Sequence, residues 1–172
     1  MKEVSTAQAH NDAPHEVTEM AALAARFVNS THRHVFLTGK AGTGKTTFLH
    51  TLARSTHKRY IILAPTGIAA LNAGGVTIHS QFQLPFGSFI PERQMPADIA
   101  AHGAFVDQHT LSSRHFMSAI KRAVLRDVDL LIIDEVSMLR GDLLDAIDAR
   151  MRSVRGNSRS FGGAQLLLIG DP

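Results

Sequence analysis

Residues 35–49 read VFLTGKAGTGKTTFL. Apolar residues lead into a glycine-rich turn, and the turn ends at Lys45 and Thr46. Glycines let the backbone curl, so that successive N–H groups and the positive end of the next helix point at one anion. The spacing of Gly39, Gly44, Lys45 and Thr46 is that of a phosphate-binding loop between a strand and a helix. The stretch therefore predicts a nucleotide-binding site at the end of a strand.

The same loop predicts which groups hold the nucleotide. We expect Lys45 to reach the β- and γ-phosphates of ATP and to act in catalysis, and the Thr46 hydroxyl to bind Mg²⁺. ATP and Mg²⁺ are the predicted cofactors. The predicted nucleotide-binding residues are Gly39, Ala41, Gly42, Thr43, Gly44, Lys45, Thr46 and Thr47.

A second motif supplies two carboxylates. Asp134 and Glu135 directly follow the apolar run at residues 130–133, at the carboxyl end of a predicted strand. In open parallel sheets this end faces the nucleotide. We expect Asp134 to bind Mg²⁺ directly or through water, and Glu135 to act as the general base for the water that attacks the γ-phosphate. An acid in this position favours hydrolysis over phosphate transfer to a bound hydroxyl.

The apolar pattern predicts an α/β fold. Four short apolar runs are nearly continuous, as is typical of strands buried on both faces, and helical patterns alternate with them. The expected strands are 35–37, 60–64, 130–133 and 166–169, and the expected helices are 17–29, 45–54, 68–72, 111–126 and 138–154. We predict a three-layer domain with a mostly parallel sheet, in which the strands lie in the order second, third, fourth, first.

The composition fits one globular domain. The chain has 172 residues, 44% of them apolar, with 18 Lys and Arg against 15 Asp and Glu, and neither Cys nor Trp. We expect a mobile leader at residues 1–16, a domain at 17–172 and an irregular insertion near 84–109, where three prolines occur. No apolar run is long enough for a membrane helix, and the start lacks a signal peptide's apolar core, so we expect a cytoplasmic protein without a membrane partner.

Charge is distributed unevenly along the chain. Residues 20–91 contain seven Lys and Arg but no Asp or Glu. Such a segment attracts phosphate, although a solvated basic face explains the charge equally well when charge is considered alone. The phosphate-binding loop inside the segment favours the first interpretation.

Four stretches together resemble a known family. They are VFLTGKAGTGKTTFL at 35–49, APTGIAALNAGGVTIHSQF at 64–82, LLIIDEVSM at 130–138 and FGGAQLLLIGD at 161–171. In this order they are similar to the first motifs of superfamily 1B DNA helicases, in particular the Pif family, with RecD as a relative. The similarity covers the chain from about residue 17 to its end.

The resemblance implies a RecA-like first motor domain that hydrolyses ATP and moves 5′ to 3′ on single-stranded DNA, so single-stranded or forked DNA is the expected partner. In that family the segments matching 65–67 and 77–80 line the DNA track. Hydroxyls and N–H groups inside the acid-free segment also suit phosphate contacts that do not read sequence. An alternative stays open in which these residues only start a helix and pack on the sheet. The residues expected to contact DNA are Thr66, Gly67, His79, Ser80 and Phe82.

The resemblance also implies parts that this sequence does not hold. Asp171 matches the start of the family's third motif, and the sequence stops at Pro172, before the glutamine that usually follows. The second RecA-like domain and its arginine finger are likewise missing, so we expect a domain truncated at its C-terminus, with weak turnover on its own. The adenine-reading glutamine common before the first helix has no obvious counterpart near Thr18, and Gln8 is a distant candidate.

Two other functions stay open at this point. The chain is alternatively a P-loop ATPase of the AAA type that acts on protein partners, or a nucleotide-binding module without catalysis. Stimulation of ATP hydrolysis by single-stranded DNA distinguishes the first from a helicase. Loss of turnover in a Glu135→Gln variant distinguishes an enzyme from the second.

Overall fold

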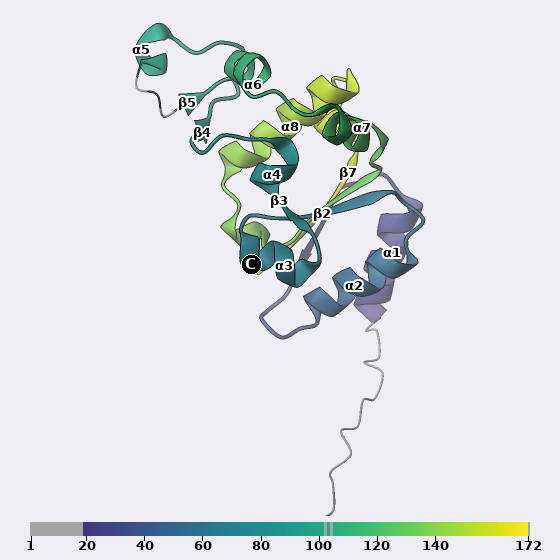
Figure 1. Cartoon of the computed structure of the whole chain (residues 1–172). Helices are drawn as coiled ribbons and strands as arrows, with labels where there is room; N and C mark the ends of the chain where they lie inside the picture. The colour runs from purple at the N-terminus through teal and green to yellow at the C-terminus, as the bar shows by residue number, and fades with distance from the viewer. Residues whose placement is uncertain (1–18, 102, 104, 172) are drawn as a thin grey trace, which may run out of the picture.

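The computed structural model describes residues 19–101, 103 and 105–171 (Figure 1). The leader predicted at 1–16 lies outside these residues, as do the first two residues of the first predicted helix.

A five-stranded parallel sheet forms the centre of the structure. Its order is β1-β7-β6-β2-β3, and every neighbouring pair is parallel. The predicted order of the four expected strands is confirmed, and a two-residue strand, β3, extends the sheet beyond β2. The strands are β1 (Val35–Thr38), β2 (Tyr60–Ala64), β3 (Val76–Thr77), β6 (Leu130–Ile133) and β7 (Gln165–Gly170).

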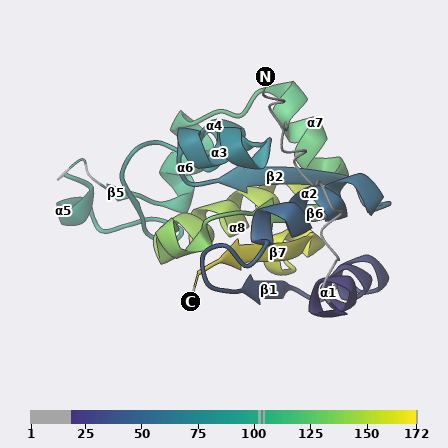
Figure 2. The ribbon, with the colours of Figure 1, turned by 90° about the horizontal axis from the view of Figure 1, so that it is seen from below.

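Helices cover both faces of this sheet (Figure 2). The apolar residues of α1 and α2 pack on one face, and those of α4, α6, α7 and α8 pack on the other. No helix in the described residues is both long and apolar enough to cross a membrane. The helices are α1 (Glu19–Ser30), α2 (Lys45–Ser55), α3 (Gly67–Ala73), α4 (Ile78–Phe82), α5 (Ala97–Ala100), α6 (Gln108–Arg114), α7 (Ala119–Asp127) and α8 (Gly141–Arg155), with 3₁₀ turns η1 (Val136–Met138) and η2 (Ser160–Gly163).

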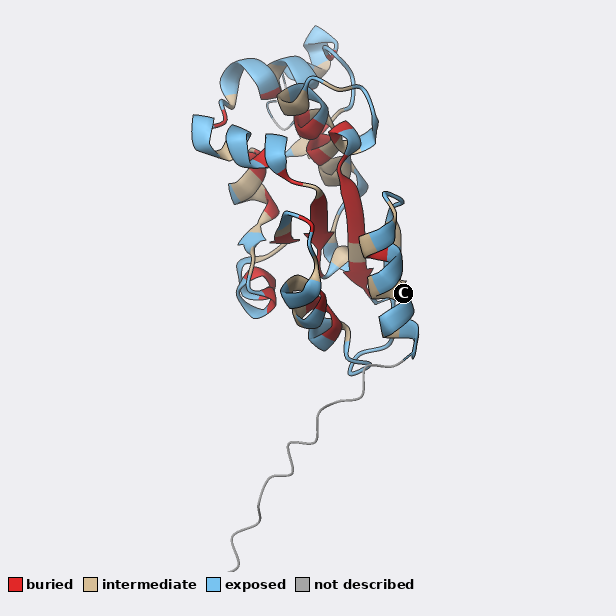
Figure 3. Ribbon diagram, turned by 90° about the vertical axis from the view of Figure 1, so that its right-hand side faces the viewer, coloured by how far each residue is buried: buried red, intermediate tan, exposed pale blue. Residues whose placement is uncertain are grey.

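Every residue of β6 and nearly every residue of β7 is buried, and the colouring of Figure 3 shows the buried strands at the centre of the molecule. In β6, Leu130 and Ile132 belong to the cluster formed with α1 and α2, whereas Leu131 and Ile133 belong to the cluster on the opposite face. Since successive side chains of a strand point to opposite faces, a strand between two helical layers needs apolar residues at every position. This requirement is the physical reason for the continuous apolar runs in the sequence.

The helix predicted over residues 111–126 is wrong, because two shorter helices, α6 and α7, lie there. The chain leaves helical geometry at His115, whose φ and ψ are −113° and 72°. The Ser118 hydroxyl then accepts a backbone N–H from the first turn of α7 at 3.3 Å and caps that helix. Arg150 of α8 donates a hydrogen bond to the His115 carbonyl. The break thus depends on a contact with a distant helix.

The insertion predicted at 84–109 contains short regular elements. β4 (Ser88–Phe89) pairs in parallel with β5 (Phe105–Val106), and α5 lies between them in sequence. The buried Asp107 carboxylate accepts the N–H of Met95 at 2.8 Å and that of Thr110 at 2.7 Å. In Figure 1 this segment lies beside α6 at one end of the molecule, away from α1 and α2.

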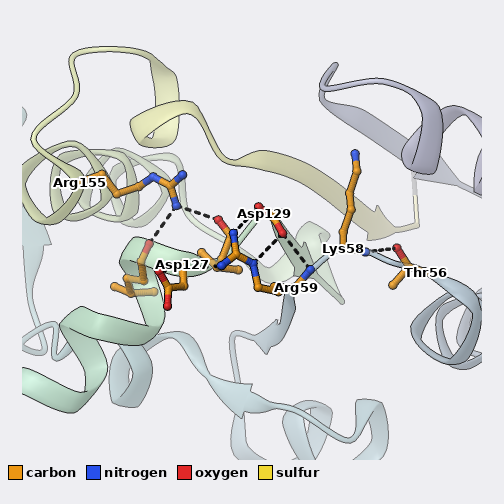
Figure 4. A network of polar contacts seen from close by, with 8 residues as sticks. Thr56, Lys58, Arg59, Asp127, Asp129 and Arg155 are labelled. Atoms are coloured by element: carbon orange, nitrogen blue, oxygen red, sulfur yellow. Dashed lines mark hydrogen bonds and ion pairs between the residues drawn. The ribbon is translucent and has the colours of Figure 1, made fainter.

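Lys58 connects the C-terminus of α1 to the N-terminal edge of the sheet through hydrogen bonds. Its side chain is buried, and its ammonium donates to the carbonyls of Val28 and Thr31 at 2.6 Å each and to Gln165 Oε1 at 2.5 Å. Burial lowers the pKa of this ammonium. The two carbonyls lie at the C-terminus of α1, where a cation also meets the negative end of the helix dipole. Figure 4 shows Lys58 next to a network of ion pairs at this edge.

Candidate nucleotide-binding site

The glycine-rich loop joins β1 to α2, as predicted, and has the backbone that the motif requires. Gly44 immediately precedes α2 with φ of +84°, a left-handed conformation that side chains disfavour. A Cβ added to Gly39 would lie 2.6 Å from Thr43 Oγ1, so the loop closes on itself too tightly for a larger residue. The N-terminus of the 11-residue helix α2 therefore lies directly beside the loop.

Lys45 lies in the first turn of α2 and points back over the loop. Its Nζ donates to the carbonyls of Gly39 at 2.6 Å and Lys40 at 3.0 Å, and forms an ion pair with Asp171 Oδ1 at 2.6 Å. Asp171 follows β7, the neighbour of β1 in the sheet. The sequence motifs point to Asp171 but do not pair it with Lys45. The predicted strand order contains the signal, because it places the ends of these two strands side by side.

A cavity of about 680 Å³ opens beside the loop. It lies within the size range of small-molecule sites, which runs from roughly 300 to 1,000 Å³. Seven of the eight predicted nucleotide-binding residues line it, and the eighth, Gly39, accepts a hydrogen bond from Lys45 through its carbonyl. The full lining is Ala21, Ala25, Ala41, Gly42, Thr43, Gly44, Lys45, Thr46, Thr47, Phe48, Thr51, Leu52, Glu135 and Asp171.

Helix α1 forms a wall of this cavity that the sequence did not predict. Its contribution is Ala21 and Ala25, one helical turn apart. Alanines at this spacing carry no chemical signature of their own, so only the three-dimensional packing of α1 against the sheet reveals them.

The two predicted carboxylates have different surroundings. Asp134 is 8% exposed, and its Oδ1 accepts the backbone N–H of Glu135 at 3.0 Å. Glu135 has φ of +53°, an uncommon conformation for a residue with a side chain, and it is exposed and lines the cavity. The turn at Glu135 thus directs the second carboxylate toward the cavity, while the first is held at the end of β6.

The oxygen donors at this edge fit Mg²⁺. Mg²⁺ prefers oxygen ligands, and at nucleotide sites it takes one or two protein groups together with phosphate and water oxygens. Thr46 offers an exposed hydroxyl at the start of α2, and Asp134 offers a carboxylate at the end of β6. Within residues 19–101, 103 and 105–171, no group of three or more His, Cys, Asp and Glu side chains is placed to hold a metal.

Four of the five expected DNA-contacting residues lie at one edge of the sheet, the C-terminal edge. Thr66 follows β2 and caps α3, its hydroxyl accepting the N–H of Ala69 at 3.2 Å, and the exposed Gly67 is the first residue of α3. His79 and Ser80 lie in α4, directly after β3, and β3 pairs in parallel with β2. Ser80 is exposed and His79 is partly buried.

Phe82 is a correction to the prediction. Its side chain is 0% exposed and belongs to the same core cluster as Leu63 and Ile133. A ring in this position stabilises the packing of α4 on the sheet and does not reach a surface ligand. The expected contact between Phe82 and DNA is therefore wrong in this conformation, and the sequence motif contains a core residue at its end.

Comparison with known proteins points to one family. A family model described as PIF1-like helicase matches residues 15–172. Among curated relatives, ATP-dependent DNA helicase PIF7 of Trypanosoma brucei brucei is 38% identical over 145 residues, and ATP-dependent DNA helicase PIF1 of Xenopus laevis is 36% identical over 140 residues. Each match covers 81% of this chain, but only 13% and 19% of the two relatives. The chain thus spans less than a fifth of their length.

A solved structure gives the same result for the fold. The Pif1 helicase from Bacteroides in complex with ADP-AlF3 and ssDNA is 41% identical, with a TM-score of 0.75. The match covers 90% of this chain and 32% of that chain. The predicted fold class, an α/β domain of the RecA-like kind with a mostly parallel sheet, is confirmed.

Proposed function

The chain belongs to the PIF1-like helicase family, and on this basis we propose that it carries the ATP-binding and ATP-hydrolysing site of a DNA helicase. The observation that carries the proposal is the convergence of Lys45, Glu135 and Asp171 on one cavity, from segments that follow three neighbouring strands. Family membership also favours a helicase over an ATPase of the AAA type. A cytoplasmic location stays a prediction.

The chemical roles in this proposal follow from the positions of the side chains. The loop N–H groups and Lys45 would hold the phosphates, and Thr46 and Asp134 would hold Mg²⁺, which would neutralise charge on the phosphates. Glu135 is exposed at the cavity and accepts the proton of the attacking water. Asp171 keeps the Lys45 ammonium close to the loop through their 2.6 Å ion pair.

The proposed partner is single-stranded or forked DNA, along which the family resemblance implies 5′-to-3′ movement. Thr66, Gly67, His79 and Ser80 form the proposed contact surface, since all four follow neighbouring strands at the C-terminal edge of the sheet. The ssDNA in the Bacteroides structure supports this choice of partner. A second RecA-like domain, contributed from outside this sequence, belongs to the same proposal and completes the site for ATP.

The Glu135→Gln variant tests the proposed reaction. Removing a general base costs roughly 10²- to 10⁴-fold in rate, whereas the isosteric amide preserves the shape of the cavity. We expect the variant to bind Mg-ATP as the wild type does and to lose turnover by that factor, measured under single-turnover conditions with protein in excess of labelled ATP. Glu92→Gln, an exposed glutamate outside the cavity, is the matched control. Unchanged turnover in Glu135→Gln would refute the assignment.

A further inference from the structure

Phe86 is an exposed aromatic ring that is nevertheless held in place. Its side chain is 92% exposed, and its ring stacks on the ring of His79 with 5.0 Å between the centroids and an interplanar angle of 19°. A solitary apolar side chain at a surface needs no explanation. A ring stacked on one face and open on the other is different, because it presents a flat surface of defined orientation.

The backbone around Phe86 is fixed on both sides. Leu84 is buried, and its N–H donates to the His79 carbonyl at 3.1 Å. On the other side, Arg140 donates to the Gly87 carbonyl at 2.8 Å. Arg140 is itself paired with Asp142 at 2.6 Å. The backbone on both sides of Phe86 is thus hydrogen-bonded, and the ring between these anchors lies stacked on His79.

His79 forms the inner half of this pair as a neutral ring. Burial lowers its pKa from the ordinary value, and the positive charge of Arg140 lowers it further. A neutral imidazole stacks on a phenyl ring with little desolvation cost, and the lowered pKa favours this neutral form. The two rings come from different segments, α4 and the loop after it, and the stack joins them.

The surroundings of the pair indicate the chemistry of its ligand. Phe86 lies in the acid-free segment of residues 20–91. Next to His79 in α4, Ser80 is exposed, and the Lys121 ammonium donates to the Ser80 carbonyl. Aromatic side chains next to hydroxyl and cationic groups are the arrangement that binds single-stranded nucleic acid, with bases on the rings and the backbone on the polar groups.

We propose that the outer face of Phe86 stacks against an unpaired base of single-stranded DNA, with His79 as the support behind it. The inference rests on the proposed function and deepens it, because it names a base contact beside the phosphate contacts expected at Thr66 and Ser80. Stacking of this kind tolerates every base, since each presents a π face. The contact therefore holds the strand without selecting its sequence.

The test compares DNA binding by the whole chain and its variants through fluorescence anisotropy at low salt. A stacking contact to one base corresponds to about 5- to 150-fold in affinity. We expect Phe86→Ala to raise the Kd for an oligothymidylate by a factor in this range, and Phe86→Tyr to restore it. Phe116→Ala removes another largely exposed ring, at the junction of α6 and α7, and is expected to bind as the wild type does.

An oligomer of the same length that lacks bases separates stacking from charge. If Phe86 contacts a base, wild type and Phe86→Ala bind this abasic strand equally. Equal affinity of the two proteins for the oligothymidylate, or an equal loss on both strands, overturns the stacking proposal while leaving the DNA-binding function in place. If the wild type binds neither strand, the DNA-binding part of the proposed function fails, and the stacking proposal fails with it.

Discussion

At the scale of single residues, the candidate site depends on one ion pair, between Lys45 and Asp171, and on a carboxylate that lines the same cavity. Lys45 contacts two loop carbonyls and Asp171, and Glu135 faces the same cavity. The loop and the carboxylate pair were predictable because their chemistry fixes residue types at fixed spacings. The contact between Lys45 and Asp171 joins positions 126 residues apart, and only the neighbouring placement of β1 and β7 creates it.

Asp142 gives a prediction for pH dependence. Hydrogen bonds from Arg140, at 2.9 and 2.6 Å, and one from the Phe89 N–H, at 2.9 Å, lower its pKa from 3.8 to about 2. A carboxyl whose pKa is lower in the folded state contributes stability above its unfolded pKa and loses it as the pH falls through the folded value. Asp142 therefore contributes fully above about pH 4, and its contribution fades toward pH 2.

We expect Asp142→Asn to reduce the free energy of unfolding at pH 7 by about 1 to 2 kcal/mol, a figure that allows for partial solvent screening. The difference from the wild type should shrink as the pH falls from about 4 toward about 2, because the wild-type carboxyl becomes protonated. Urea unfolding at several pH values measures this difference in unfolding free energy. The control is Asp145→Asn, which changes an exposed carboxylate on α8. A difference that stays constant with pH would contradict the assigned pKa.

At the scale of elements, the sequence predicts those helices and strands that are long and well buried, and misses the short ones. The strands β2, β6 and β7 were found because both of their faces are buried and their sequences are continuously apolar. The sequence does not predict the elements at residues 76–82, because both are too short to give an apolar pattern. β3 has two residues and pairs only with β2, and α4 has five residues. The break before α7 is stabilised by the Ser118 cap and by the hydrogen bond from Arg150 to the His115 carbonyl. The spacing of apolar residues along the sequence predicts neither contact.

Helix α1 yields a prediction about the cavity wall. In Lys58→Met, the carbonyls of Val28 and Thr31 and the amide oxygen of Gln165 lose their common donor in a buried setting. Each such loss typically costs about 1 to 3 kcal/mol, and we expect roughly 2 to 4 kcal/mol in all after local rearrangement. The loosened helix should exchange its amide hydrogens faster than in the wild type, whereas the amides of β6 keep their relative protection.

Hydrogen exchange followed by mass spectrometry measures this effect along the chain. Arg59→Met is the matched control, because it removes the neighbouring cation from an exposed ion pair with Asp129 at the same edge of the sheet. Exposed pairs of this kind contribute little to stability because solvent screens their charges. Faster exchange of α1 in the control to the same degree as in Lys58→Met would refute a specific role of Lys58 in holding the wall.

At the scale of the whole molecule, the order of the strands creates the site. Because β1, β7 and β6 are parallel neighbours, the residues that follow them meet at one edge of the sheet. This convergence was predictable from the motifs, since a loop and a carboxylate pair that serve one triphosphate must come together. The alanine wall of α1 and the Phe86–His79 stack were not, because both arise from packing between segments that carry no motif in common.

The most direct test of the account is the affinity of the chain for Mg-ATP, measured by isothermal titration calorimetry with the wild type and two lysine variants. Lys45→Ala removes the ammonium that would contact the phosphates, a charge-assisted contact that corresponds to roughly 10- to 150-fold in Kd. Lys40→Ala removes an exposed lysine of the same loop, so this control variant has the same net charge as Lys45→Ala. The account predicts binding by the wild type and by Lys40→Ala and a loss in that range for Lys45→Ala; equal affinity of all three proteins, or no binding by the wild type, would contradict it.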